Sequence, residues 1–248
     1  MRLISLCALA VSCTAFGSYP ENDLDKEDFV NSFTASISEY DFRRTIDQVV
    51  NYYRPIVQSR GAQLNVEYNW ADSTVNAYAD KQEGIWTISM FGGMARRPEI
   101  TLDGFMTVVC HEMGHLLGGF PFYSNEDLAA EGQADFWATQ ACAKRVWGGG
   151  GPAVKARAVA ASRSISNLLA TLEGSSYPSP DRKDPSVVLY TQDTHPRAQC
   201  RLDTYLAGIA CNQVFPLDAY PKTQFQAYST SCLGLQKGAR PRCWFAPK

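Results

Sequence analysis

The chain has 248 residues, of which 45% are apolar and 19% charged, and its formal net charge is −2. This composition is typical of a globular protein with a sizeable core. The small net charge offers no electrostatic attraction to nucleic acid or to an anionic membrane, so we expect neither as a partner.

The first 17 residues have the pattern of an export signal. Arg2 is followed by an apolar run over residues 3–16, and the small-x-small pattern Ala15-Phe16-Gly17 precedes a polar stretch. We therefore expect cleavage after residue 17 and export to the periplasm, the cell envelope or the medium. The apolar run is shorter than the roughly 20 residues that span a bilayer, and no later segment approaches that length. A buried N-terminal helix is the alternative interpretation.

Two of the eight cysteines, Cys7 and Cys13, lie in this segment. Ala10-Val11-Ser12-Cys13 is a poor relative of a lipidation box, so a lipid anchor at Cys13 competes with simple signal cleavage. An even number of remaining cysteines in an exported chain favours disulfides over free buried thiols. These cysteines lack the C-x₂₋₄-C spacing of a cysteine zinc site: Cys110, Cys142, Cys200, Cys211, Cys232 and Cys243.

The order of elements predicts one α+β domain over residues 18–248, a small twisted sheet packed on a helical core that disulfides support. Alternating apolar residues predict strands over 64–70, 75–79 and 85–91, with a hairpin-like connection over 80–84. Helical periodicity, capping residues and Gly/Pro signals predict the helices: 24–59, Asp103 to Gly118, Ser124 to Arg145, 153–172 and 194–210.

The five residues His111-Glu112-Met113-Gly114-His115 lie on the helix predicted from Asp103. Residues four apart share a helical face, so His111 and His115 can bind one metal ion. Glu112 is rotated by about 100°, beside the metal, where a general base for a zinc-activated water belongs. Zinc would polarise a substrate carbonyl and lower the pKa of that water toward about 7. Because the motif specifies only three positions, it needs further support.

The next predicted helix offers a third ligand in Glu131-Gly132-Gln133-Ala134-Asp135. Glu131 and Asp135 share a face, so Glu131 can coordinate the metal while Asp135 accepts a hydrogen bond from a zinc histidine. Gly132 inside a helix costs about 1 kcal/mol relative to Ala, and we expect a close approach of two helix backbones to explain it. A solvated acidic pair is the alternative.

His195, in Asp193-Thr194-His195-Pro196, is the third histidine of the chain. It is the imidazole available to stabilise the oxyanion of a tetrahedral intermediate, and we expect Asp193 to help keep it protonated. Pro196 suits the first turn of the helix predicted over 194–210. The alternative is a surface histidine that caps this helix.

Four blocks together resemble the gluzincin metallopeptidases, specifically the minigluzincin-like branch. This branch includes the CAAX prenyl protease type and bacterial periplasmic quality-control peptidases. The blocks cover roughly residues 60–211: Asn76-Ala77-Tyr78-Ala79 with the strand over 84–93, Cys110 to Leu116, Glu131 to Ala138, and His195-Pro196 followed by Arg201.

The resemblance implies that Glu131 is the third ligand, that His195 assists the transition state and that Arg201 orders the site through polar contacts. It also implies that the strand from Asn76 to Ala79 is an edge that binds extended substrate by strand addition. The membrane-embedded members have transmembrane helices that this chain lacks, so their prenylated substrates are not carried over.

Cys110 departs from the family pattern and points about 100° away from His111, so it is a poor fourth ligand. Cys142 shares a helical face with Glu131 and Asp135. If the two site helices are antiparallel, Cys142 passes near the start of the His111 helix, and we predict a Cys110–Cys142 disulfide. Cys200 and Cys211 are about 16 Å apart on one predicted helix, so each pairs elsewhere or stays free.

The leading hypothesis is therefore an exported zinc metalloendopeptidase with one Zn²⁺ per chain and a protein or peptide substrate. An envelope binding or assembly factor with a peptidase fold and a gated or structural zinc site is the alternative. A third hypothesis keeps the chemistry and makes cell-wall peptide crosslinks the substrate, although nothing in the chain resembles a glycan-binding module.

Overall fold

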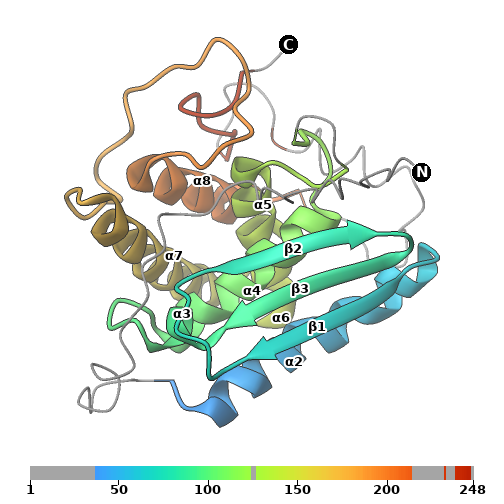
Figure 1. The fold of residues 1–248 in the computed structure, drawn as a ribbon. Helices are drawn as coiled ribbons and strands as arrows, with labels where there is room; N and C mark the ends of the chain where they lie inside the picture. The colour runs from blue at the N-terminus through green and yellow to red at the C-terminus, as the bar shows by residue number, and fades with distance from the viewer. Residues whose placement is uncertain (1–36, 124–126, 214–231, 233–237, 247–248) are drawn as a thin grey trace, which may run out of the picture.

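A three-stranded sheet lies in front of the helices in Figure 1, and the expected α+β class is confirmed. This computed structural model describes residues 37–123, 127–213, 232 and 238–246. The expected signal over 1–17 with Cys13, and the first part of the helix expected over 24–59, lie outside the described residues. Within the described residues, no helix is long and apolar enough to cross a membrane.

The central strand of the sheet is β3 (Ile85–Phe91). It pairs in parallel with β1 (Gln63–Asn69) and antiparallel with β2 (Ala77–Gln82). The strand predicted over 75–79 thus begins and ends later than expected. The connection to β3 is only Glu83-Gly84, whose φ angles of 43° and 83° suit a two-residue hairpin turn.

One face of the sheet is apolar and packs on helices, because alternate strand residues point to the same face. Leu64, Ile88 and Met90 are buried on it. The helix α2 (Glu39–Ser59) packs against β1, and α4 (Leu102–Leu117) packs against β2 and β3. The short α3 (Gly92–Arg96) connects β3 to this layer.

The start of α4 differs from the expectation by two residues. The N-cap is Thr101, whose hydroxyl accepts a hydrogen bond from the Gly104 amide, rather than Asp103. Asp103 instead forms a two-bond ion pair with Arg157 on α7 (Pro152–Glu173). Every residue of α4 from Gly104 to Leu117 is buried, so this helix lies in the centre of the core.

The helix predicted from Ser124 to Arg145 is corrected at its start and in its interior. It begins at Glu131, with Ala130 as an N-cap that provides no side-chain bond, rather than at Ser124. Residues 124–126 are outside the described part. The segment continues through different helix types: α5 (Glu131–Trp137), the π-helix η1 (Ala138–Ala143) and α6 (Lys144–Val146).

The last long helix, α8 (Ala198–Ala210), packs against α7, α5 and η1. It begins later than the predicted residue 194, because Arg197 is its N-cap and Pro196 precedes its first turn. His195 therefore lies in the non-helical segment that leads into α8.

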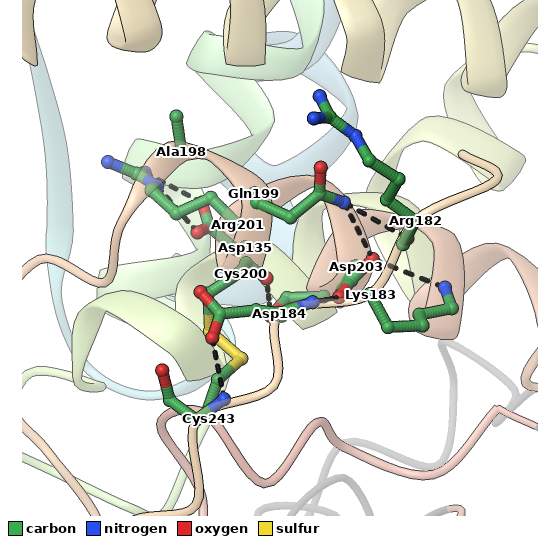
Figure 2. The surroundings of a disulfide bond; sticks show 12 residues. Asp135, Arg182, Lys183, Asp184, Ala198, Gln199, Cys200, Arg201, Asp203 and Cys243 are labelled. Carbon is green, nitrogen blue, oxygen red and sulfur yellow. Dashed lines mark hydrogen bonds and ion pairs between the residues drawn. A yellow bond between two sulfur atoms is a disulfide. The ribbon is translucent and has the colours of Figure 1, made fainter. Parts of the chain in front are cut away.

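The described residues contain three disulfides, and the predicted Cys110–Cys142 bond, which joins α4 to η1, is confirmed. Cys200 bonds Cys243 and Cys211 bonds Cys232, so Cys200 and Cys211 pair elsewhere as expected. The second disulfide ties the segment 238–246 to α8, as Figure 2 shows.

Candidate metal centre

The α4 helix brings two imidazoles together inside the protein. His111 and His115 are one turn apart and only 5% and 6% exposed, and their Nε2 atoms are 3.0 Å from each other. The helical spacing produces this pairing, because residues four apart share a face.

The far nitrogen of each ring has its own hydrogen-bond acceptor. His111 Nδ1 is 2.7 Å from the Asp135 carboxylate, and His115 Nδ1 is 2.7 Å from the Ala129 carbonyl oxygen. A proton on each Nδ1 leaves a lone pair on each Nε2, the tautomer in which histidine binds metals. Two such lone pairs at 3.0 Å need a positive charge between them.

The pKa values of the two histidines shift in opposite directions, because only His111 has two carboxylates within ion-pair distance. Burial opposes the charge on His111, but the Asp135 and Glu131 carboxylates overcome it and raise its pKa to about 10. Burial lowers the pKa of His115 to about 4, and charged His111 adds to that effect. Without metal the cluster thus stores one proton on His111, and metal binding must release it.

Glu131, the first residue of α5, faces both rings. Its Oε2 is 3.3 Å from His111 Nε2 and its Oε1 is 3.5 Å from His115 Nε2. Tetrahedral zinc, with bonds of about 2.0–2.1 Å, separates neighbouring ligand atoms by about 3.3 Å. Each histidine nitrogen therefore lies about one zinc-ligand spacing from one of the two Glu131 oxygens, Oε2 for His111 and Oε1 for His115. Glu131 Oε2 is also buried without a hydrogen-bond partner among the described residues, although Arg201 Nη2 lies 3.5 Å from it as an ion-pair partner.

Glu112 also belongs to this group. Its carboxylate and one nitrogen of each histidine all lie within 4.8 Å of one another, so it is a second candidate for the carboxylate ligand. Glu131 is the better candidate, because its oxygens approach the two Nε2 atoms to 3.3 and 3.5 Å. Burial raises the pKa of Glu112 to about 7, which suits a general base at neutral pH.

Asp135 and Arg201 form a buried ion pair beneath His111. Arg201 donates through Nε and Nη2 to the two carboxylate oxygens of Asp135, at 2.7 Å each. Figure 2 shows Arg201 pointing to Asp135, while the neighbouring Cys200 bonds Cys243. Burial opposes the charge on Asp135, but Arg201 and then His111 lower its pKa to about 2, so the carboxylate stays ionised.

His195 lies on the open side of the cluster. Its Nε2 is 3.2 Å from Glu131 Oε1, and its side chain is 24% exposed, against 7% for those of His111 and His115. Burial lowers the pKa of His195 although Glu131 acts in the other direction. The expected role of Asp193 in keeping this ring protonated stays a prediction.

Tyr123 is a site residue that the sequence analysis missed. Its hydroxyl donates a hydrogen bond to Glu131 Oε1, and its ring stacks on His115 with 5.7 Å between ring centres. Burial raises the pKa of Tyr123, so the phenol keeps its proton. It lies between two helices where no periodicity exists, and no sequence signal pointed to it.

Two glycines next to the ligands permit close contacts, and one differs from the expectation. A Cβ at Gly132 would lie 2.2 Å from the Trp244 ring, so Gly132 makes room for an indole rather than for a helix backbone. The close helix approach occurs at Gly114, where a Cβ would lie 2.8 Å from the Ala134 carbonyl oxygen. That approach brings Glu131 and Asp135 up to His111.

The block from Asn76 to Ala79 lies at an edge of the sheet. Ala77, Tyr78 and Ala79 belong to β2, which pairs with β3 on one side and with no other described strand, whereas Asn76 precedes the strand. The Asn76 side chain accepts a hydrogen bond from the Ala77 amide.

Comparison with known proteins yields no match among protein families, curated proteins or solved structures. The chemistry must therefore be argued from the arrangement of these side chains.

Proposed function

We propose that the protein is a zinc-dependent endopeptidase in which His111, His115 and Glu131 hold one Zn²⁺ and Glu112 is the general base. One observation carries this proposal: the buried Nε2 atoms of His111 and His115 lie 3.0 Å apart, and the Glu131 carboxylate faces them at 3.3 Å through Oε2 and 3.5 Å through Oε1. A buried cluster of this kind is costly unless a cation occupies it.

Bound zinc would polarise the scissile carbonyl and make the attacking water more acidic. Glu112 then removes a proton from that water and delivers it to the leaving amine. Its raised pKa, about 7, favours both steps, because the group that accepts the proton must also release it. The neighbouring Asp135–Arg201 pair keeps His111 oriented through its Nδ1 atom.

His195 is placed to contact the substrate. As the most exposed side chain among the site histidines, it can donate a hydrogen bond to the oxygen that becomes negative during the reaction. The edge of β2 is a candidate for binding an extended peptide through backbone hydrogen bonds. This arrangement supports a peptide or protein substrate.

The disulfides support an oxidising compartment, in agreement with the proposed export to the periplasm, the cell envelope or the medium. A cell-surface location through a lipid on Cys13 is tested by mass spectrometry of the mature N-terminus. The same mass-spectrometric measurement tests the predicted cleavage after residue 17.

The test of the reaction is Glu112→Gln. The substitution removes the base but keeps the size of the side chain, so zinc content should remain one per chain while peptide-library cleavage falls at least about a hundredfold. Glu39→Gln, at a side chain that is 49% exposed, is the matched control and should cleave as the wild type does.

Two results would overturn the proposal. Wild-type protein purified without chelator that contains no stoichiometric metal would remove the zinc site. Cleavage that survives in Glu112→Gln would remove the role of this base. Zinc-loaded wild type that cleaves no peptide would favour the binding or assembly factor.

A further inference from the structure

The two oxygens of the Glu131 carboxylate have different surroundings. Oε1 accepts a hydrogen bond from the Tyr123 hydroxyl and lies 3.2 Å from His195 Nε2. Oε2 is buried and has no hydrogen-bond partner within the described part of the chain, and its nearest charged groups are His111 Nε2 at 3.3 Å and Arg201 Nη2 at 3.5 Å. Oε1 is therefore the oxygen that accepts a hydrogen bond, whereas Oε2 faces positive charge without forming one.

Tyr123 is positioned by more than this one bond. Its ring stacks on His115 at an interplanar angle of 23°, so the same side chain contacts two of the three candidate ligands. The backbone around it is also anchored, because the Tyr123 amide donates to the Leu128 carbonyl and Phe122 bridges to Ala129. Ala129 in turn accepts the bond from His115, so this segment supports the site at two points.

We propose that Tyr123 is a positioning residue that makes Glu131 a ligand through Oε2 alone. This inference rests on the proposed zinc site. The hydroxyl fixes the carboxylate by bonding Oε1, which leaves Oε2 as the oxygen that has no hydrogen bond and can bind the metal. A carboxylate that donates one oxygen leaves space for water and substrate, whereas one that donates both fills it.

The test is Tyr123→Phe, which keeps the ring on His115 and removes only the hydroxyl. Zinc affinity, measured by competition with a chromophoric chelator, should fall about tenfold to a hundredfold, the range for lost partners of metal ligands. In the cobalt-substituted protein, the visible absorption should weaken as Glu131 becomes free to bind through both oxygens and the coordination number rises. Tyr190→Phe, at an 83% exposed tyrosine, is the matched control and should change neither.

Wild-type protein labelled with ¹³C at the tyrosine ζ carbon provides a measurement that needs no variant. Zinc binding should shift the signal of one buried tyrosine, because it withdraws charge from the carboxylate that this hydroxyl contacts. The absence of any shifted tyrosine signal would overturn the inference even if Tyr123→Phe fails to fold.

The outcomes separate this inference from the proposed function. If wild type binds zinc and cleaves peptides while Tyr123→Phe keeps the same zinc affinity and cobalt spectrum, Tyr123 has no positioning role and the zinc peptidase proposal stands. If the wild type binds no zinc, the proposed function fails first.

Discussion

The two walls of the candidate site are held in place by different forces. On one side, α4 presents His111 and His115 from a helix whose residues from Gly104 to Leu117 are all buried in the main apolar core. On the other side, α8 and the segment 238–246 contribute Arg201, Trp244 and Arg240 through polar bonds and disulfides.

The helix α4 thus carries the two candidate histidine ligands, whereas α8 and the segment 238–246 hold the residues that orient the site. Apolar burial around α4 stabilises without direction, and the Cys110–Cys142 bond adds one covalent link to η1. The second wall depends on buried charge pairs, which lose much more when one partner is removed than they contribute when complete. Damage to α8 should therefore disturb the orientation of His111 before it disturbs the fold around the sheet.

Among substitutions that test the difference between the two walls, Arg201→Ala should have the largest effect on stability. The substitution removes the guanidinium that donates two hydrogen bonds to the Asp135 carboxylate, which is 0% exposed, and leaves the bond to His111 in place. We expect the free energy of unfolding of the zinc-free protein to fall by about 3–5 kcal/mol. Urea unfolding measures it.

The matched control is Arg157→Ala, which removes an equally bidentate pair with Asp103 at side chains that are 48% and 31% exposed. Solvent screening should limit its cost to less than about 1 kcal/mol. Equal losses in the two variants would show that burial does not distinguish the second wall.

Removal of disulfides should give the next largest effect. The bonds Cys110–Cys142 and Cys200–Cys243 span 32 and 43 positions, so replacing either pair by alanine should cost about 3 kcal/mol. The two variants should lose similar amounts of stability, but hydrogen exchange should accelerate in different regions of the protein. Only loss of Cys200–Cys243 should speed hydrogen exchange of the Gln192 amide, which donates to the Trp244 carbonyl at 2.8 Å.

Exchange at Gln192 that accelerates equally in both disulfide variants would contradict this separation of the two walls. The control within each sample is the Ala129 amide, which donates to the His115 carbonyl at 2.9 Å on the α4 side. It should keep its protection when Cys200–Cys243 is removed.

The smallest effect is a pH dependence that belongs to the second wall. Arg201 and His111 lower the folded pKa of Asp135 from 3.8 to about 2. This contribution is complete above the unfolded pKa and is lost as the pH falls through about 2, an effect of about 2 kcal/mol. Between pH 5 and pH 2, the free energy of unfolding of the zinc-free wild type should fall by about 2 kcal/mol more than that of zinc-free Asp135→Asn. An identical pH dependence in the two proteins would assign the acid sensitivity to other carboxylates.

The predictable parts of this protein are those with a local period. The alternation over residues 64–70 and 85–91 identified β1 and β3, and the spacing of His111, His115, Glu131 and Asp135 anticipated which side chains share a face. The faces of the two site helices also predicted the Cys110–Cys142 disulfide, which is confirmed.

The parts that sequence could not provide depend on contacts between distant segments. Local capping chemistry predicted a helix start at Ser124, but α5 starts at Glu131 without a side-chain cap, directly after the bridge between Phe122 and Ala129. Gly132 signalled a close contact, but not that its partner is Trp244. Tyr123 has no pattern at all, because its role follows from the path of an irregular connection.

The contacts that residues 240–244 make with α5 have a consequence for biosynthesis. Arg240 bonds Gln133 across 107 positions of sequence, and Trp244 fills the space above Gly132. A chain emerges from the ribosome from its N-terminus, so α4 and the sheet can form before residues 240–244 make these contacts. An intermediate stopped before residue 240 would carry the two histidines and Glu131 without a fixed geometry. Maturation of the candidate metal centre would thus wait until residues 240–244 have joined the fold.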